Sequence, residues 1–182
     1  LVRKPSVSRQ RHAGPMKRTI ILGLAAVSTG LIATSTVLSS HEVLLWNRTA
    51  SAPEGLYWRS DGPLTLNGWA VVSGKAPAAI WIADHGFLAP GWPVIKRVRG
   101  LSGDEICREN ESVSINGETV ATALETDSNG LELPTWRGCF TLGEGEVFLL
   151  NDHPRSLDGR YFGATQIEDV RGSARLLFSI SD

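Results

Sequence analysis

Halfway along the chain the sequence reads Val94-Ile95-Lys96-Arg97-Val98-Arg99, a short β-prone run that mixes apolar and basic side chains. In a β-strand, successive side chains point to opposite faces. Val94, Lys96 and Val98 therefore share one face, and Lys96 points with two valines toward the interior. Burial disfavours the ammonium form, so we expect the pKa of this lysine to fall from about 10.4 to near 7, where a neutral amine acts as a base. The alternative is a lysine whose stem covers the apolar face while its head stays in solvent.

Similar short runs, separated by Gly, Pro and Asn, continue through most of the chain. They predict strands over residues 69–73, 79–83, 94–99, 112–115, 118–121, 146–150 and 174–180, and either a first strand or the end of a helix over 43–46. Asn116-Gly117 is predicted to form a two-residue hairpin turn. No helical periodicity is visible after residue 45, and residues 125–138 are interpreted as an excursion. The pattern predicts a mostly β domain, a barrel or a sandwich-like body.

The start of the chain has a different composition. Its first 18 residues contain no acid, and their basic residues are Arg3, Lys4, Arg9, Arg11, Lys17 and Arg18. Residues 19–40 carry no formal charge. As a helix they would span about 33 Å, against a hydrocarbon core of about 30 Å, and a basic flank stays in the cytoplasm. We therefore expect a basic cytoplasmic N-terminus over 1–18, a transmembrane anchor over 19–40 and an exported β-rich domain over 41–182.

A cleaved secretory signal is the alternative for residues 19–40, because serines, threonines and glycines dilute their apolar character. Both interpretations place the rest of the chain outside the cytoplasm. The only methionine, Met16, lies just before the apolar run. Met16 is therefore one hypothesis for the natural start, and a start at or before Leu1 is the alternative.

Composition limits the partners and cofactors. A net charge of −1 and a hydrophobic content of 42% indicate a folded domain with no nucleic-acid surface. The histidines, His12, His41, His85 and His153, show no metal-ligand spacing, so we expect neither metal nor cofactor. Cys107 and Cys139 agree with an oxidising compartment, where a disulfide between them would be worth roughly 3 to 4 kcal/mol. The alternative is two unrelated buried thiols.

A neutral lysine needs a nucleophile as its partner. The segment Thr49-Ala50-Ser51-Ala52-Pro53-Glu54-Gly55 offers Ser51 between two alanines, in a turn shaped by proline and glycine. Small neighbours leave room for a peptide, and a desolvated amine can take the proton of a serine hydroxyl as histidine does in other hydrolases. Taken alone, Ser51 would be an ordinary turn residue.

Three segments occur in an order that resembles one family. The segment around Ser51 is followed by Ile95-Lys96-Arg97-Val98-Arg99-Gly100-Leu101-Ser102-Gly103-Asp104 and by Ser156-Leu157-Asp158-Gly159-Arg160-Tyr161-Phe162-Gly163. Together they resemble the type I signal peptidases, which are membrane-anchored Ser/Lys endopeptidases with a β-rich exported domain. The resemblance extends from the anchor to Gly163.

The resemblance implies a role for each matching residue. Ser51 would be the nucleophile and Lys96 the general base, and Ser156 would orient the lysine amine. Asp158 and Arg160 would pair to brace that group. The alternative for the last three residues is an ordinary surface turn.

The resemblance also implies an oxyanion hole. It would consist of the Ser51 backbone N–H and the Thr49 hydroxyl, and one such donor is typically worth about 2.7 to 4 kcal/mol in the transition state. The sequence departs from the usual pattern at Ser102 and Gly159, where proline and serine are common. Neither residue carries a proposed catalytic atom, so these departures concern the stiffness of the loops, including the one that carries Ser156.

Within the family, Pro53, the following Gly55-Leu56-Tyr57 and the two cysteines resemble the TraF-type peptidases that mature conjugative pilins. This branch implies an exported pilin precursor as protein substrate, cleaved with or without joining of its ends, by an enzyme of the inner membrane whose catalytic domain is periplasmic. One alternative is a general leader peptidase that accepts many precursors. Another is a catalytically silent assembly subunit of a conjugation or secretion apparatus.

The lipid bilayer is the second expected partner. Ser51 follows the apolar run by about ten residues, so an extended chain keeps it within roughly 35 Å of the bilayer. Trp46, Trp58 and Trp69 are expected either to form an interfacial aromatic surface or to pack in the core.

Overall fold

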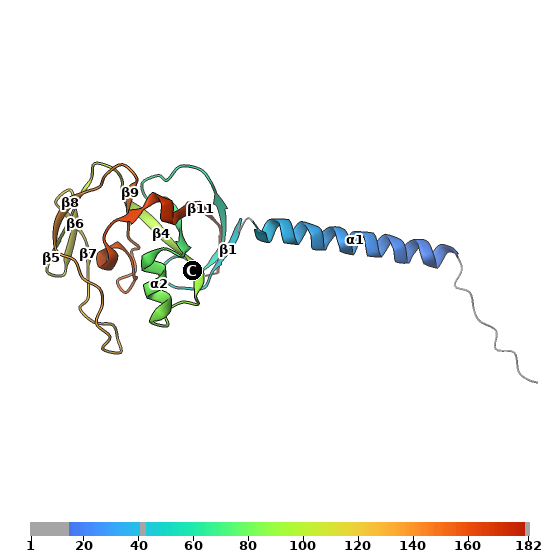
Figure 1. Cartoon of the computed structure of the whole chain (residues 1–182), viewed down its shortest axis with the longest axis horizontal. Helices are drawn as coiled ribbons and strands as arrows, with labels where there is room; N and C mark the ends of the chain where they lie inside the picture. The colour runs from blue at the N-terminus through green and yellow to red at the C-terminus, as the bar shows by residue number, and fades with distance from the viewer. Residues whose placement is uncertain (1–14, 41–42, 181–182) are drawn as a thin grey trace, which may run out of the picture. The chain divides into compact units, whose positions relative to one another are not determined.

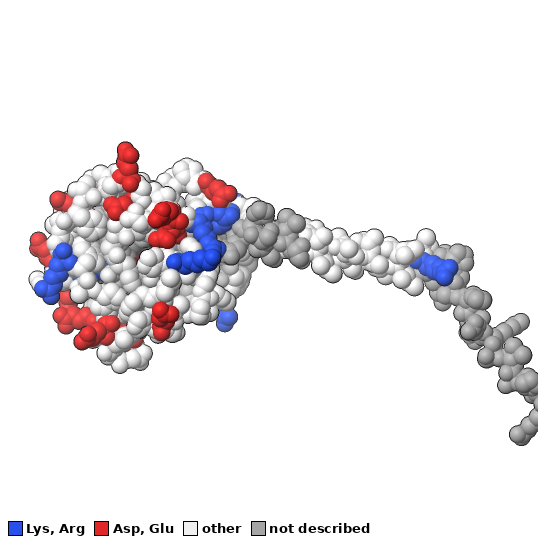
Figure 2. Space-filling model, viewed as in Figure 1, with Lys and Arg blue, Asp and Glu red and all other residues white. Residues whose placement is uncertain are grey.

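The computed structural model describes residues 15–40 and 43–180. It divides into two units, one up to residue 42 and one from residue 43 onward. The first unit contains helix α1 (Pro15–Ser40) (Figure 1). Within the described residues α1 is the one helix long and apolar enough to cross a membrane, with a mean hydropathy of 1.4 over Arg18–Ser35. Its side chains from residue 19 to residue 35 are exposed, and Figure 2 shows no Asp or Glu on them.

The second unit contains two antiparallel sheets. The larger sheet has the strand order β1 (Leu44–Asn47), β2 (Gly55–Ser60), β11 (Val170–Ser179), β3 (Trp69–Gly74), β4 (Gly91–Gly100), β9 (Glu146–Leu149) and β10 (Thr165–Gln166). The smaller sheet has the order β7 (Glu118–Thr122), β6 (Ser112–Ile115), β5 (Glu105–Glu109) and β8 (Gly138–Thr141). The other elements are α2 (Pro77–Asp84), α3 (Gly159–Phe162) and the 3₁₀ turn η1 (Ile167–Asp169). The prediction of a mostly β fold is confirmed.

Strand β11 connects the early and middle parts of the chain. It pairs with β2 on one side and with β3 on the other, so that Ala174 lies between Arg59 and Trp69. The β1–β2 hairpin is thereby joined to the β3–β4 pair. Figure 1 shows the β5–β8 sheet at the opposite end of this unit from β1.

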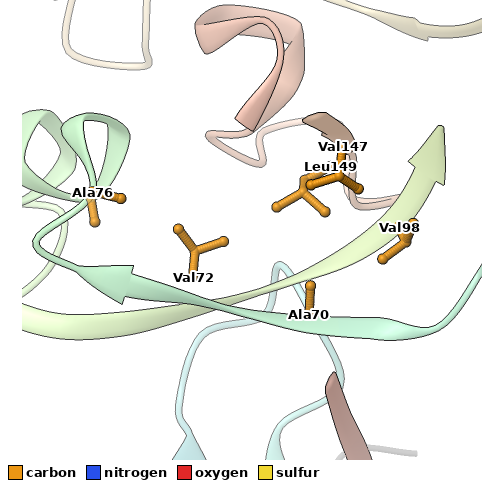
Figure 3. Close-up of a cluster of buried hydrophobic side chains, with 7 residues drawn as sticks. Ala70, Val72, Ala76, Val98, Val147 and Leu149 are labelled. Carbon is orange, nitrogen blue, oxygen red and sulfur yellow. The ribbon is translucent and has the colours of Figure 1, made fainter. Parts of the chain in front are cut away.

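A core of small aliphatic side chains lies between the large sheet and α2. Side chains from β3 and β4 face those from β9 and from the start of α2 (Figure 3). The cluster consists of Ala70, Val72, Ala76, Ala79, Val98, Val147 and Leu149. Because these residues fill one side of β3 and β4, they fix the position of the strand that carries Lys96.

Most strand predictions are confirmed. The predicted runs correspond to β3, β4, β6, β7, β9 and β11, and residues 43–46 contribute to the first strand, β1. Asn116 and Gly117 form the expected turn, since Ile115 pairs with Glu118 and both turn residues have positive φ, 50° and 81°. Strands β2, β5 and β8 were missed, because their short runs mix polar and apolar residues and owe their pairing to neighbouring strands. Strand β10 was missed as well, because it has only 2 residues.

The strand predicted over residues 79–83 is wrong, and so is the absence of helix after residue 45. These residues lie in α2, which begins with Pro77 in the first turn, where a missing N–H costs nothing. Ala79 and Ile82 are buried at helical spacing. A short apolar run does not by itself distinguish a buried strand from a buried helix.

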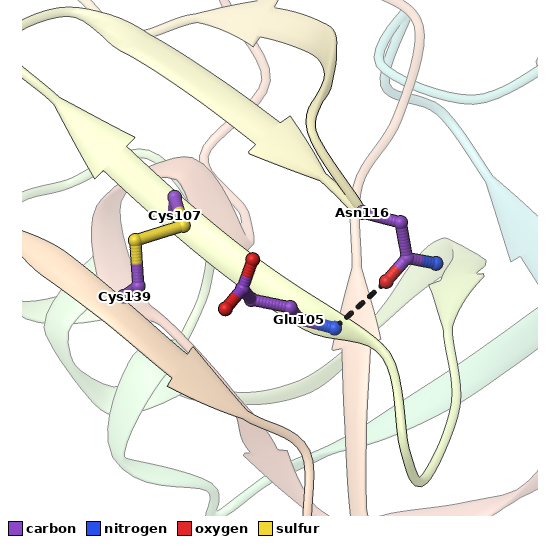
Figure 4. The surroundings of a disulfide bond; sticks show 4 residues. All are labelled: Glu105, Cys107, Asn116 and Cys139. Carbon is purple, nitrogen blue, oxygen red and sulfur yellow. Dashed lines mark hydrogen bonds between the residues drawn. A yellow bond between two sulfur atoms is a disulfide. The ribbon is translucent and has the colours of Figure 1, made fainter.

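Cys107 and Cys139 form a disulfide between neighbouring strands β5 and β8 (Figure 4). The bond spans 32 residues of sequence and encloses the excursion at residues 125–138. Within that excursion the structure has an isolated bridge between Thr126 and Glu132. The alternative of two unrelated thiols is wrong.

The three early tryptophans differ in environment. Trp46 and Trp58 are 46% and 44% exposed. Trp69 is half-buried, packs edge-on against Tyr57 with ring centroids 6.0 Å apart, and lies under the Arg97 guanidinium. Trp69 therefore packs against the core, which was one of the two alternatives expected for the tryptophans.

Candidate active site

The β1–β2 hairpin carries Ser51 at the middle of its loop. Asn47 pairs with Gly55 at the base, so residues 48–54 form the connection. Gly55 has a φ of 153°, and a Cβ atom there would lie 2.1 Å from the carbonyl oxygen of Phe178 on β11. Glycine at this position therefore lets β11 pass directly beneath the loop.

The loop is held from inside by a tyrosine. The Tyr57 hydroxyl donates a hydrogen bond of 2.9 Å to the Pro53 carbonyl. Burial raises the pKa of Tyr57 to about 12, with the Arg97 charge acting in the opposite direction, so the phenol remains a donor at neutral pH. Ser51 is half-buried, and its Oγ lies 3.4 Å from the Thr49 Oγ1.

Lys96 lies on β4 opposite Ala70 and is 6% exposed. Its Nζ donates a hydrogen bond of 3.0 Å to the Ser156 Oγ. Burial lowers the pKa of Lys96 from 10.5 to about 8, while the Asp158 carboxylate acts to raise it and the Arg160 guanidinium to lower it. The alternative of a head group in solvent is wrong, although the pKa falls less far than the expected value near 7.

Asp158 and Arg160 form a buried ion pair close to Ser156 in the chain. Arg160 Nε donates to Asp158 Oδ1 at 2.8 Å, and both side chains are almost fully buried, with exposures of 2% and 0%. Arg160 also donates to the Pro154 carbonyl at 2.9 Å. Ser156 itself is 1% exposed, so this segment is a buried, cross-linked loop and not an exposed surface turn.

One apolar cluster brings the loop and the lysine strand together. Ala52, Tyr57 and Ile95 are buried in the same cluster. Ala52 follows Ser51 in the chain, and Ile95 precedes Lys96. Packing of the two apolar neighbours therefore brings two polar residues into one region although 45 positions separate them in sequence.

A cavity of about 400 Å³ joins the candidate residues. Its wall includes Thr49, Ser51, Lys96 and Ser156 among mostly apolar side chains. The charged side chains in this wall are all basic, because Arg48 and Arg155 join Lys96 there. Within the described residues no hydrogen bond links Ser51 to Lys96. In unliganded hydrolases such catalytic contacts are often long and shorten when substrate binds.

Sequence reasoning missed Asn47 and Asn151. Their side chains contact the backbone beside Ser51 and beside Lys96, respectively. An asparagine next to a proline-containing turn usually stabilises that turn locally, so the sequence contains no signal that separates these two from other asparagines.

Comparison with known proteins identifies the family. The sequence profile described as "Signal peptidase, peptidase S26" matches residues 16–179. The chain belongs to the signal peptidase family. Members of this family are serine peptidases that act on protein substrates, and all of the candidate residues lie within the matched range.

The chain is also similar to two proteins of Escherichia coli named "Plasmid transfer protein TraF". One is 30% identical over 166 residues, which cover 84% of this chain and 88% of the relative. The other is 32% identical over 128 residues, covering 64% and 72%. A "Conjugal transfer protein TraF" of Agrobacterium fabrum is 33% identical over 96 residues, which cover 50% of this chain and 53% of the relative.

Among solved structures, a signal peptidase I from Enterococcus faecalis is 22% identical, with a TM-score of 0.36, and the match covers 63% of this chain and 98% of that one.

Proposed function

We propose that this signal peptidase family member is an active serine endopeptidase in which Ser51 is the nucleophile and Lys96 the general base. The observation that carries the proposal is the buried Lys96 amine, whose pKa is lowered to about 8 and which lines the same cavity as the Ser51 hydroxyl. A base with a pKa near the working pH is the most effective. The mostly apolar lining keeps the amine dry and favours its neutral form.

The proposed reaction has two halves. Lys96 accepts the proton of the Ser51 hydroxyl as the Oγ forms a bond with the scissile carbonyl carbon, and the Ser51 N–H and Thr49 hydroxyl stabilise the oxyanion. The tetrahedral intermediate collapses, the peptide C–N bond breaks, and the leaving amine takes the proton from Lys96. A water molecule or the amino group of a peptide then attacks the acyl carbon while Lys96 accepts its proton. The ester bond between the acyl carbon and Ser51 Oγ breaks, and Oγ takes the proton back from Lys96. Water gives hydrolysis, and an amine gives a new peptide bond.

The proposed substrate is the precursor of a conjugative pilin. This is supported by the relatives named as plasmid and conjugal transfer proteins, two of which match more than two thirds of their own length. The apolar, cationic cavity suits an extended peptide with apolar side chains and disfavours a basic one.

The proposed location is the inner membrane, with α1 as anchor and the β-rich unit in the periplasm. The apolar window at Arg18–Ser35 and the basic residues that precede it support this orientation. The disulfide between Cys107 and Cys139 supports an oxidising compartment.

The experiment is processing of the candidate pilin in cells, followed by mass spectrometry. Ser51→Ala and Lys96→Met should abolish processing, whereas Ser102→Ala and Lys75→Ala, matched changes at exposed positions, should leave it intact. A mature mass lower by one water than the linear product indicates ring closure. Processing by Ser51→Ala would refute the proposal and favour a silent assembly subunit, and rescue of cells depleted of their leader peptidase would favour the general leader peptidase.

A further inference from the structure

We propose that Asn47 and Asn151 are positioning residues, one for each member of the Ser51 and Lys96 pair, each using its amide group to fix the backbone from which the reacting side chain projects. This inference rests on the proposed function, since it assigns supporting partners to the same two residues. A side-chain amide both donates and accepts. It can therefore replace a missing backbone partner of either kind.

Asn47 binds the Ser51 loop from within. Its Nδ2 donates to the carbonyls of Thr49, Ala52 and Pro53 at 2.9, 3.0 and 3.1 Å. Its Oδ1 accepts from the Thr49 backbone N–H at 3.2 Å. These contacts lie on both sides of Ser51, so one side chain sets the path of the loop through the nucleophile.

Asn47 also determines the direction of the Thr49 hydroxyl. Thr49 Oγ1 donates its hydrogen to Asn47 Oδ1 at 2.8 Å, because an unprotonated amide oxygen can only accept. Toward Ser51 Oγ, 3.4 Å away, Thr49 therefore offers a lone pair. To stabilise the oxyanion, the Thr49 hydroxyl must break its hydrogen bond to Asn47 and donate to the substrate oxygen instead. Asn47 thus holds this hydroxyl in place in the free enzyme.

The side chain of Asn151 supplies hydrogen-bond partners to β4 beyond the last pairing between β4 and β9. The last strand pairing joins Val98 to Leu149, the final residue of β9. Just after β9, the N–H of Leu150 donates to the Arg97 carbonyl at 2.9 Å. The Asn151 Oδ1 accepts from Arg97 N at 2.8 Å, and its Nδ2 donates to the Ile95 carbonyl at 3.2 Å. The two bonds lie on either side of Lys96.

The backbone of Asn151 connects the lysine strand to the Ser156 loop. Its N–H donates to Asp158 Oδ2 at 3.0 Å, and its carbonyl accepts from Arg160 Nη2 at 2.7 Å. Asn151 is 1% exposed. One buried residue therefore holds the backbone of Lys96 and the loop whose Ser156 oxygen accepts from the lysine.

The proposal predicts different signatures for the two asparagines. Asn47→Ala and Asn47→Asp each lose the three donor contacts and should lower kcat for cleavage of the purified pilin precursor by at least about tenfold, with KM within about twofold of wild type. In the double variant Asn47→Ala/Thr49→Ala, the loss of kcat should be smaller than the two single losses combined, because Asn47 acts partly through Thr49. Additive effects, or a change confined to KM, would overturn the role of Asn47. The exposed Asn129→Ala is the matched control.

For Asn151 the informative change is Asn151→Asp, which is nearly the same size. A carboxylate repels the Ile95 carbonyl and adds negative charge beside Lys96, where Asp158 and Arg160 already act and Arg48 and Arg155 line the cavity. The pH at half-maximal kcat/KM should rise by about one unit. Asn151→Ala, which adds no charge, should lower kcat without that shift. An Asn151→Ala enzyme with an unchanged kcat, or an Asn151→Asp enzyme with an unchanged pH profile, would overturn the role of Asn151.

A measurement without substrate separates this inference from the proposed function. Urea unfolding of full-length Asn151→Asp, with and without Lys96→Met, reports the lysine pKa through the pH dependence of stability. If the lysine pKa rises in Asn151→Asp while the wild-type protein cleaves no pilin precursor, the result supports the role of Asn151 and refutes the peptidase. If the wild-type protein cleaves the precursor while the lysine pKa is unchanged in Asn151→Asp, the result supports the peptidase and refutes the role of Asn151.

Discussion

A change of pH should alter activity and stability through the same group, Lys96. Its pKa is about 8 in the folded protein, against an ordinary value of 10.5. At about pH 7 about one lysine in eleven is then neutral, and at about pH 9.5 nearly all are, so kcat/KM should rise about tenfold between these values. The assay is cleavage of the proposed substrate, a purified pilin precursor, by the full-length protein in detergent.

The stability change has a definite sign. Between the folded and the unfolded pKa, the unfolded chain keeps a proton that the folded protein has released, so the free energy of unfolding rises with pH. For pKa values of about 8 and 10.5, the rise between about pH 7 and pH 9.5 is about 2 kcal/mol. Lys96→Met removes the titrating group while keeping an unbranched apolar stem, and the difference between the two proteins isolates the lysine from all other groups.

Urea unfolding at several pH values measures this difference, with Lys75→Met as the control for an exposed lysine. We expect wild type and Lys75→Met to gain stability in parallel and Lys96→Met to lack about 2 kcal/mol of that gain. Parallel curves for wild type and Lys96→Met would show that Lys96 titrates normally. A rate that falls as the pH rises through 8 would refute the general-base role directly.

Three further predictions concern the surroundings of Lys96 and the second sheet. Ser156→Ala removes the acceptor of the lysine amine and should lower kcat about tenfold with little change in KM, as measured on the same precursor. Asp158→Asn leaves Arg160 buried without its counter-charge, so urea unfolding should show a loss of about 3 to 5 kcal/mol. The pH profile of activity should also move to lower pH, because the carboxylate raises the pKa of Lys96. Unchanged stability would show that the ion pair between Asp158 and Arg160 does not stabilise the fold. Replacing Cys107 and Cys139 by serine should cost roughly 3 to 4 kcal/mol of stability, and a loss below about 1 kcal/mol would show that the unfolded chain gains little freedom when the bond is absent.

Local alternation was sufficient to predict much of the sheet. The run at residues 94–99 gave both the strand and the inward direction of Lys96, since these depend only on a period of two. The helix at Pro77–Asp84 was mistaken for a strand, because its apolar run is too short to reveal a helical period. Strand β2 was missed because it is defined by its neighbours β1 and β11, and pairing between distant segments leaves no mark on the local pattern.

The sequence predicted which residues belong to the candidate site better than it predicted how they meet in space. Lys96 was singled out by its position in a strand, Ser51 by its turn and its neighbours, and Ser156 by the resemblance of three segments to the type I signal peptidases. Their meeting in one cavity depends on the apolar cluster that contains Ala52, Tyr57 and Ile95, and no local pattern predicts that cluster. Asn47 and Asn151 were missed because their importance comes from unpaired backbone groups, and these exist only once the fold has formed.

The position of β11 has a consequence for the order of events during biosynthesis. Residues 170–179 are made more than a hundred residues after Ser51, yet they form the strand that separates β2 from β3. Before that segment arrives, the hairpin bearing the serine and the strand bearing the lysine have no common sheet. A nascent or truncated chain that lacks residues 170–179 should therefore lack the proposed peptidase activity, because Ser51 and Lys96 would not yet belong to one sheet.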